Sequence, residues 1–507
     1  MVGTSAPTDR LSPTRTPRWL VPLLFVLTAV WPLFMHLDTL PLRIWDEARQ
    51  SISAYEMLHN GDWLVAHFYG VPDMWSTKPP LLIWIQTGLF ALLGPGELAL
   101  RLPSAIAALL TGWFLLRFTT RTLHAPWLGS VACLMLYTSD GYIHMHVARS
   151  GDYDALLVLF MTTSAWTLFR WTTDGRPRDL LWFFVLLTLG VLTKSVQALL
   201  FVPGLAIFLF FSRKVPALLK QRMFYIGMAL FVTVVGGFYL LRESVNPGYL
   251  QAVWDNELGG RYGSALEGHH QPWNFYITML MEHHFVWWWL LVPLGLFIGL
   301  AHRDGQIRRW TWLLAGMGGI YLYIISSAGT KLEWYSAPLF PVLCGLAAIP
   351  VHVLLQWTFT EGWSGVFLTK RVLPWALLFM IFLQPYSAII GRTYFPKEYP
   401  WEKDLYAASA YLHRAVRGGP LEAEVFCHDT YNAHLTFYAW LLKDQGRSLR
   451  SVSKHELEPG MRAMAAEATV KETIEQLYAH RVVHEDGALR IYEIIGRHQA
   501  NAHEPAS

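Results

Sequence analysis

The sequence predicts a polytopic α-helical membrane protein with a small extracytoplasmic α/β domain at its C-terminus. Of its 507 residues, 53% are hydrophobic and only 15% are charged, whereas about 25% are charged in an ordinary soluble domain. Apolar runs fill the chain up to about residue 390, and charged residues become frequent after that point. The 24 Trp and 22 Tyr residues also indicate a membrane protein, because these rings favour headgroup depth in a bilayer.

About eleven apolar segments are expected to cross the membrane, since a span needs roughly 20 apolar residues. The candidate segments are approximately 19–36, 98–118, 127–139, 155–171, 180–193, 196–212, 222–242, 284–301, 310–327, 334–356 and 372–390. The polar, basic stretch before the first segment is expected to stay in the cytoplasm, with the segment retained as a span rather than cleaved as a signal peptide.

Basic residues test this topology, because lysine and arginine are enriched in cytoplasmic loops. With the N-terminus inside, every basic cluster between spans falls on the inner side: Arg117, Arg121, Arg170, Arg176, Arg178, Arg213, Lys214, Lys220, Arg222, Arg303, Arg308, Arg309, Lys370 and Arg371. The alternation holds only if the apolar segment 78–97 is a helix at the outer interface rather than a span. The long outer loops are then 37–97, 140–154 and 243–283, so we expect the chemistry on the outer face.

Two domains follow from this organisation, a membrane domain over 1–390 and a soluble α/β domain over 391–507. In the second domain, the segments 424–429 and 488–495 are typical of strands, and 403–416 and 468–481 are typical of helices. A formal net charge of +3 with no basic patch gives no support to nucleic-acid binding. Cys133, Cys344 and Cys427 lie far apart, so neither a disulfide framework nor a CxxC metal motif is expected.

Residues 45–49 read WDEAR and place Asp46 beside Glu47 shortly after the first apolar run. Carboxylates at the mouth of a membrane segment are costly unless they face water, a cation or a substrate. The helical pattern of residues 46–57 places Asp46 and Arg49 on one face, where Asp46 could accept a proton or hold a metal and Arg49 could bind phosphate. A surface helix whose acidic pair complements the helix dipole explains the same residues equally well.

A set of motifs within residues 1–345 resembles bacterial membrane glycosyltransferases related to the protein O-mannosyltransferases. Within that group the pattern is most similar to the aminoarabinose transferase that modifies lipid A. The motifs are WDEAR, GDWLVAHFYGVPDMWSTKPPLLIW, RLPSAIAALL, ARSGDYDALL (148–157), LTKSVQALLFVPGL (192–205), GHHQPWNFY (268–276) and GTKLEWYSAPLFP (329–341). The resemblance implies a C-type glycosyltransferase fold and the transfer of a sugar from a polyprenyl-phosphate carrier.

The resemblance also implies roles for individual residues. Asp46 corresponds to the catalytic carboxylate, a general base for the acceptor hydroxyl, and Arg49 and Lys78 match basic residues beside the carrier phosphate. The second outer loop supplies a further acidic residue, for which Asp152 is favoured. Asp154 fits either that role or capping of the helix that follows it.

Further candidates lie at the outer ends of later spans. Lys194 interrupts two apolar runs; the resemblance places it near the carrier phosphate, although simple solvation at an outer turn explains it too. Lys331 lies at a similar outer edge. Tyr335 could donate a hydrogen bond to phosphate or belong to the interfacial aromatic belt.

His269 and His270 are the first candidate ligands for a divalent ion (zinc, magnesium or manganese), since zinc favours histidine and carboxylate. Polar histidines at the membrane interface explain the same residues without a metal. In the aminoarabinose transferase, a histidine of this loop and a glutamate directly before the KPP lysine hold a metal. That preceding residue is Thr77 here, which weakens the match. Other potential ligands are Asp46, Asp73, Glu267, His144 and His146.

The predicted function is transfer of a sugar from a polyprenyl-phosphate donor, undecaprenyl phosphate in bacteria, to an acceptor on the periplasmic face of the inner membrane. Lipid A or another glycolipid is the first choice of acceptor, and a protein serine or threonine is the second. The alternatives are a transporter of lipid-linked sugars and a purely structural protein. A transporter would place charges within its spans, near the bilayer midplane.

Overall fold

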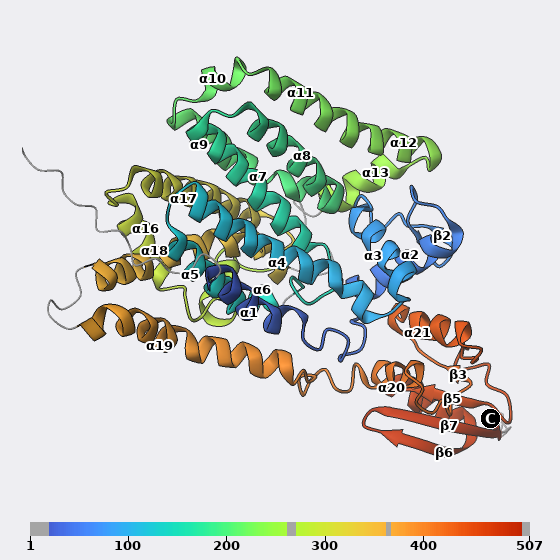
Figure 1. Cartoon of the computed structure of the whole chain (residues 1–507). Coiled ribbons are helices and arrows are strands. Elements are labelled where there is room, and N and C mark those ends of the chain that lie inside the picture. The colour runs from blue at the N-terminus through green and yellow to red at the C-terminus, as the bar shows by residue number, and fades with distance from the viewer. Residues whose placement is uncertain (1–19, 145, 261–269, 361–366, 499–507) are drawn as a thin grey trace, which may run out of the picture.

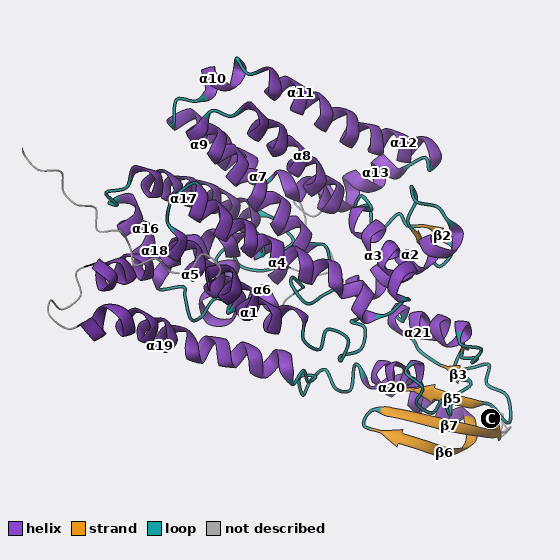
Figure 2. Cartoon of the chain, viewed as in Figure 1, coloured by secondary structure: helices purple, strands orange, loops and turns teal. Residues whose placement is uncertain are grey.

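The computed structural model describes residues 20–144, 146–260, 270–360 and 367–498. Long helices pack side by side, while α2, α3 and the C-terminal region lie together at one end of the molecule (Figure 1). Strands are confined almost entirely to the C-terminal region (Figure 2). The chain is thus a helical membrane protein with an appended mixed sheet, as the sequence predicts.

Five helical segments among the described residues are long and apolar enough to cross a membrane. They are built from α4 (Glu97–Arg121), α8 (Pro177–Lys194) with the turn Ser195–Leu199, α11 (Arg222–Phe231) continued through the π-helical turn Val232–Gly236 into α12 (Gly237–Val245), α18 (Leu339–Thr360) and α19 (Phe367–Tyr394). The other helices at predicted spans are α1 (Leu20–Phe34), α5 (Pro126–Tyr137), α7 (Asp154–Asp174), α9 (Val202–Phe211), α16 (Leu291–Leu300) and α17 (Gly305–Ser327). Each predicted span therefore contains a helix, and the number that crosses the bilayer stays a prediction.

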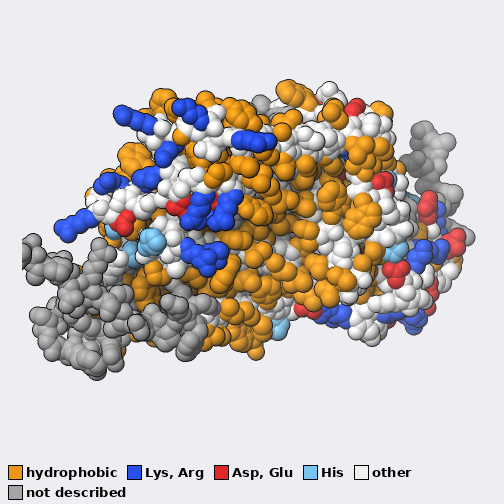
Figure 3. Space-filling view, turned by 45° about the horizontal axis from the view of Figure 1, so that its top comes forward, with side chains coloured by type: hydrophobic (Ala, Val, Ile, Leu, Met, Phe, Trp, Pro, Cys, Tyr) orange, Lys and Arg blue, Asp and Glu red, His pale blue; other side chains and the backbone are white. Residues whose placement is uncertain are grey.

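The surface of the helical region is that of a protein immersed in lipid. The apolar segment Arg222–Val245 has only 6% of its residues buried, whereas Leu339–Thr358 has 72% buried in the centre of the bundle. An apolar helix with so little protein around it needs lipid as its solvent. A broad hydrophobic band separates an end rich in Lys and Arg from an end of mixed charge (Figure 3).

The outer loops contain short elements that position the candidate site. The first loop forms α2 (Asp46–Asn60), a hairpin of β1 (His67–Phe68) and β2 (Val71–Pro72), and α3 (Leu81–Leu93). With 13 residues, α3 is about 20 Å long, too short for a span, and it packs against α2 and α4. The remaining short helices are α6 (Asp140–Ile143), α10 (Val215–Leu219), α13 (Tyr249–Val253) and α15 (Phe275–Met279), with single turns at Trp254–Leu258, Leu280–His284 and Glu333–Ser336.

The C-terminal region forms a five-stranded mixed sheet in the order β4-β3-β5-β7-β6. β3 (Val425–Phe426) pairs in parallel with β4 (Arg450–Ser451) and β5 (Arg462–Ala465), while β7 (Leu489–Arg497) runs antiparallel to β5 and β6 (Tyr478–Asp486). Its helices are α20 (Ala407–Val416), α21 (Ala433–Asp444) and α22 (Ala468–Leu477).

One helix of this region is shorter than predicted. The sequence indicates a helix over 468–481, but α22 ends at Leu477 and Tyr478 begins strand β6. Tyr478 lies four residues after Ile474 and continues the helical apolar pattern, although its buried ring belongs to the sheet. The β-branched pair Val482 and Val483 favours the strand that follows.

The C-terminal region shares a hydrophobic core with the outer loops. Buried residues of α2, α3 and α4, such as Ile52 and Phe90, belong to one cluster with Leu412 of α20 and Phe437 of α21. Tyr438 donates a 2.5 Å hydrogen bond to buried Glu97 of α4 and accepts one from the Leu42 N–H. The sheet region therefore packs directly against the helical region and is not joined to it by the chain connection alone.

Candidate active site

Two acidic loops meet at the end of the helical bundle where α2 and α3 lie (Figure 1). Asp46 is the first residue of α2, and Asp152 lies in the loop before α7. One potential ligand atom from each of Asp46, His146 and Asp152 lies within 4.8 Å of the other two. The first two outer loops thus bring together the acidic residues that the sequence singles out, with a histidine between them.

The backbone is strained at three positions around this cluster. Trp45, His146 and Ser195 have φ values of 71°, 55° and 51°, in the left-handed region that side chains rarely adopt. Trp45 directly precedes Asp46, His146 belongs to the cluster, and Ser195 directly follows Lys194. Such strain persists only where the surroundings impose it, and it is concentrated at functional sites.

His146 and Asp152 form the core of the cluster. The Nδ1 of His146 lies 3.1 Å from Oδ2 of Asp152, and the imidazole stacks on Trp334 at 4.0 Å between ring centroids. Burial lowers the pKa of His146, but the carboxylates of Asp152, Asp46 and Asp154 raise it to a net value above the usual one. Burial raises the pKa of Asp152, yet the His146 hydrogen bond and the Lys194 charge hold it well below its usual value. Both shifts favour the pairing of an imidazolium with a carboxylate.

Asp154 and Lys194 form a buried ion pair beneath this cluster. The Nζ of Lys194 donates to both carboxylate oxygens of Asp154 at 2.7 Å. The same ammonium lies 5.8 Å from the centroid of the Tyr335 ring. Asp154 therefore neutralises Lys194 in this state, and a phosphate at Lys194 would have to compete with that carboxylate.

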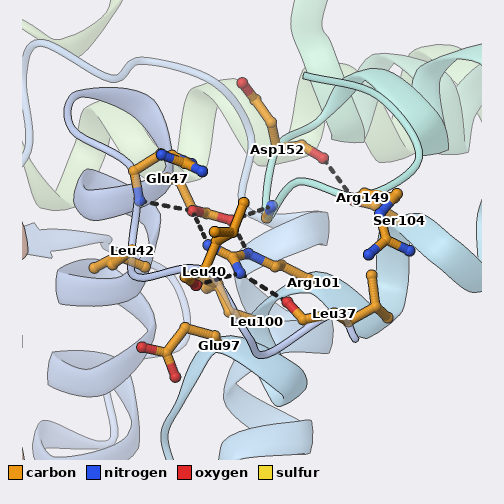
Figure 4. A network of polar contacts seen from close by, with 12 residues as sticks. Leu37, Leu40, Leu42, Glu47, Glu97, Leu100, Arg101, Ser104, Arg149 and Asp152 are labelled. Atoms are coloured by element: carbon orange, nitrogen blue, oxygen red, sulfur yellow. Dashed lines mark hydrogen bonds and ion pairs between the residues drawn. The ribbon is translucent and has the colours of Figure 1, made fainter. Parts of the chain in front are cut away.

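Glu47 has a structural position that differs from that of Asp46. Its carboxylate forms a two-pronged ion pair with Arg101, at 2.7 and 2.8 Å, and accepts hydrogen bonds from the N–H groups of Arg43 and Gly151, each at 2.8 Å (Figure 4). Burial raises the pKa of Glu47, but Arg101 and these N–H donors bring the net value below the usual one. Glu47 thus ties the loop that carries Asp46 to the loop that carries Asp152.

The geometry of this junction explains Gly151. A Cβ atom at Gly151 would lie 2.7 Å from Cγ of Leu100 and 3.2 Å from Cγ of Glu47. The carbonyl of Asp152 accepts a 3.1 Å hydrogen bond from Ser104 of α4, which fixes the same loop from its other side (Figure 4). The close approach of the two loops therefore requires glycine at position 151.

A second, cationic group lies beside the acidic cluster. Lys78 lies 3.7 Å from Glu257 and 5.5 Å from the ring of Tyr153, the residue after Asp152. Lys78, Asp73, Arg242 and Tyr249 contribute to the lining of one small pocket. Its two cations meet the requirement of a phosphate for positive charge and hydrogen-bond donors.

Arg49 and Lys331 are already engaged by other groups of the protein. Arg49 forms a two-pronged ion pair with Asp73 at 2.6 and 2.7 Å, and its guanidinium lies over the ring of Phe68. Lys331 is buried and donates to the carbonyl of Ala328 at 2.7 Å. Both side chains shape the loops in this state, and their assignment to the phosphate stays a prediction.

The two histidines of the third loop that the sequence offers as metal ligands stay a prediction. His269 falls outside the described residues, and His270 is exposed. Within the described part of the chain, the one three-ligand group is Asp46, His146 and Asp152. Metal–ligand distances of about 2.1 Å allow ligand atoms up to about 4.2 Å apart, so a small contraction of this group would accommodate a divalent ion. The residues fit such an ion, provided that His146 releases its proton.

The sequence analysis does not identify two residues of the site, Arg242 and Glu257. Arg242 is buried at the end of an apolar run, and a charge in that position was a usable signal. Glu257 has no comparable signal, because one acidic residue in a polar loop is ordinary. Only the fold places it 3.7 Å from Lys78.

Residues 77–238 match the family described as dolichyl-phosphate-mannose-protein mannosyltransferase. The fold and this match over part of the chain make the protein similar to polytopic membrane glycosyltransferases with the C-type fold. The chain is similar to the undecaprenyl phosphate-alpha-4-amino-4-deoxy-L-arabinose arabinosyl transferase of Aeromonas salmonicida, with 28% identity over 402 residues. That match covers 74% of this chain and 68% of the relative.

Solved structures share the fold. ArnT from Cupriavidus metallidurans bound to undecaprenyl phosphate matches with a TM-score of 0.70 and 15% identity, covering 96% of this chain and 99% of that one. The Archaeoglobus fulgidus oligosaccharyltransferase in complex with Zn and sulfate matches with a TM-score of 0.50 and 12% identity, covering 85% of this chain and 62% of that one. These matches confirm the predicted C-type fold and its C-terminal sheet region.

Proposed function

We propose that the protein transfers a sugar from undecaprenyl phosphate to lipid A or another glycolipid on the periplasmic face of the bacterial inner membrane. The observation that carries this proposal is the meeting of Asp46, His146 and Asp152 beside the pocket of Lys78 and Arg242. The relatives named after aminoarabinose transfer support a pentose as the sugar. The division into a membrane domain over 1–390 and a periplasmic domain over 391–507 belongs to the same proposal.

Asp46 is the base in the proposed reaction. The acceptor oxygen attacks the anomeric carbon of the donor while its proton passes to the Asp46 carboxylate, and the bond from that carbon to the phosphate oxygen breaks. Among the described residues, no hydrogen bond or ion pair engages the Asp46 side chain, whereas Glu47 is fully occupied. Asp46 is therefore the carboxylate that is ready to accept a proton.

The leaving group is a lipid phosphate that needs cations rather than a proton. Lys78 and Arg242 are placed to bind its oxygens, and Lys194 with Tyr335 provides a second set of donors closer to Asp152. Cations held in place before the reaction stabilise the charge that develops on the departing phosphate. A divalent ion held by Asp46, His146 and Asp152 would supply additional positive charge to that phosphate.

A protein serine or threonine is the second candidate acceptor, since the matching family is described by protein mannosyl transfer. The test supplies purified protein in lipid nanodiscs with an undecaprenyl-phosphate aminosugar and with lipid A or a serine-rich peptide. We expect mass spectrometry to detect an increase in lipid A mass equal to the added sugar. Modification of the peptide alone would favour the second acceptor, and unchanged donor with both acceptors would contradict the proposal.

A further inference from the structure

Two exposed aromatic residues of the first outer loop have a strained backbone. Trp45 is 60% exposed with φ 71°, and Tyr69 is 43% exposed with φ 57°. A positive φ destabilises a bulky residue by about 1–3 kcal/mol. An exposed indole or phenol ring offsets little of this, because it buries little apolar surface. At Tyr69 the two-residue turn between β1 and β2 accounts for the positive φ. The exposure of both rings, and the conformation of Trp45, need an explanation other than core packing.

The two residues belong to one aromatic surface that joins the first loop to the C-terminal region. Trp45 stacks on Tyr431 with 4.6 Å between ring centroids, and Tyr431 lies nearly parallel to Phe68 at 6.4 Å. Phe68 contacts Tyr69 at 4.3 Å, and the Tyr431 hydroxyl donates to the Trp45 carbonyl at 3.2 Å. We call Trp45, Phe68, Tyr69 and Tyr431 the aromatic platform.

Polar side chains flank the aromatic platform on the side of the C-terminal region. The Tyr69 hydroxyl donates to Asn432 at 2.8 Å, Asn432 contacts His428, and His428 lies 3.2 Å from the Ser451 hydroxyl. His428 follows β3, and Ser451 ends β4, its parallel neighbour. Crevices at the carboxyl ends of parallel strands are a common place for ligands.

The aromatic platform is also continuous with the candidate active site. Trp45 directly precedes Asp46, the proposed base, and the Tyr431 hydroxyl donates to the Trp45 carbonyl, which belongs to the peptide bond between these two residues. Arg49, on the same helix as Asp46, lies 4.1 Å from the centroid of the Phe68 ring. The platform is therefore adjacent to the loop that carries the proposed base.

We propose that the aromatic platform binds a sugar ring of the acceptor glycan, an inference that rests on the proposed function and names the surface that holds its acceptor. A pyranose ring presents C–H groups on one face, which pack on an aromatic ring, and hydroxyl groups at its edge, which need hydrogen-bond partners. The platform supplies the first through Trp45 and Tyr69 and the second through Asn432 and His428. This combination of an apolar floor with a few polar groups is typical of small-molecule sites.

An interfacial aromatic belt is the competing explanation for exposed Trp and Tyr residues. Trp182 and Trp312 are exposed on helices of the bundle, at 55% and 61%, and have ordinary backbone conformations. The rings of the platform differ because Trp45 and Phe68 pack against Tyr431 of the C-terminal region, and Tyr69 donates a hydrogen bond to Asn432 of the same region. These differences favour a sugar over lipid as the occupant.

The test uses full-length protein in nanodiscs and the glucosamine disaccharide from deacylated lipid A, with and without the donor. Trp45→Gly removes the ring and suits a positive φ, so it separates ligand binding from folding, and Tyr431→Phe keeps the stacked ring but loses its hydroxyl. Trp63→Ala removes another exposed Trp of the same loop as a matched control. We expect Trp45→Gly to weaken disaccharide binding at least tenfold by titration calorimetry and to raise the acceptor KM similarly, while the donor KM changes less than twofold.

The outcomes separate this inference from the proposed function. Equal disaccharide affinity in Trp45→Gly and the wild type would overturn the aromatic platform, whether or not the protein transfers sugar. Disaccharide binding that depends on Trp45 in a protein without transferase activity would overturn the proposed function and keep the platform.

Discussion

The carboxylate of Glu47 accepts a 2.8 Å hydrogen bond from the backbone N–H of Gly151, although the two residues are 104 positions apart in the chain. Each is the immediate neighbour of a candidate catalytic residue, Asp46 in one case and Asp152 in the other. Arg101 holds Glu47 in place through two further hydrogen bonds. The separation of the two acidic residues therefore depends on a third carboxylate, which is buried and paired with Arg101.

Replacing Glu47 tests this arrangement. Glu47→Gln leaves the buried Arg101 guanidinium without its counter-charge, so we expect a loss of about 3–5 kcal/mol in unfolding free energy. The exposed pair of Asp174 and Arg176, 3.4 Å apart, provides the control, and Asp174→Asn should cost less than about 1 kcal/mol. Denaturant unfolding in detergent measures both.

A double substitution distinguishes lost charge pairing from lost shape. Glu47→Leu combined with Arg101→Met removes both charges, so the double variant should be more stable than the sum of the single effects predicts. Strict additivity of the two single effects would show that the pair does not connect the loops.

Asp46→Asn should remove the proposed base while keeping the fold. We expect transfer to fall by about 10²–10⁴-fold, the usual contribution of a general base, with an unchanged thermal midpoint. Asp255→Asn, on an exposed part of the third outer loop, is the matched control. Steady-state transfer of the aminosugar measures the effect, and wild-type turnover in Asp46→Asn would exclude the residue as the base.

Lys78→Ala should weaken donor binding more than catalysis of bound donor. A lost hydrogen bond to a charged group costs about 1.5–3 kcal/mol, so the donor KM should rise about 10–100-fold, and Arg242→Ala should behave similarly. Lys403→Ala, exposed in the segment after α19, serves as the control. An unchanged affinity for undecaprenyl phosphate in Lys78→Ala would remove the residue from the phosphate site.

The His146–Asp152 pair predicts a pH-dependent stability. Because the folded pKa of His146 is raised, its contribution is complete below the unfolded value of about 6.5 and disappears as pH rises through the folded value. Asp152 has a lowered folded pKa, so its contribution is present above about pH 3.9 and disappears at lower pH. His146→Gln should therefore lower the thermal midpoint by about 2–4 °C at pH 6 and by less at pH 9, as measured by scanning fluorimetry.

Metal binding at the same group should depend on pH in the opposite sense. A divalent ion competes with the proton on His146, so zinc affinity should rise as pH rises through the His146 pKa. His144→Gln, which alters the neighbouring histidine paired with Asp140 at 2.8 Å, is the control. Zinc titration at pH 6 and 8 checks this, and identical affinity in His146→Gln and the wild type would place the metal elsewhere.

The sequence was sufficient for the helical membrane fold, because the hydrophobic runs that form its helices are local features of the chain. It also identified the loops of Asp46 and Asp152, since adjacent acidic residues near apolar runs are conspicuous. It could not distinguish the roles of Asp46 and Glu47, because only the fold brings Arg101 and Gly151 to one of them. Likewise, the position of His146 beside Asp46 and Asp152 depends on which loop folds over Asp152, a property of tertiary structure alone.

The Tyr438 hydroxyl lies between Glu97 of a membrane helix and the backbone of Leu42, which has a practical consequence for protein engineering. Ending the chain after α19 would expose one side of the hydrophobic core that the C-terminal region shares with α2, α3 and α4. It would also leave the buried carboxylate of Glu97 without its hydrogen-bond donor. The C-terminal sheet is consequently not a removable module, and chimaeras that exchange it between related enzymes must carry the facing surfaces of α2, α3 and α4 with it.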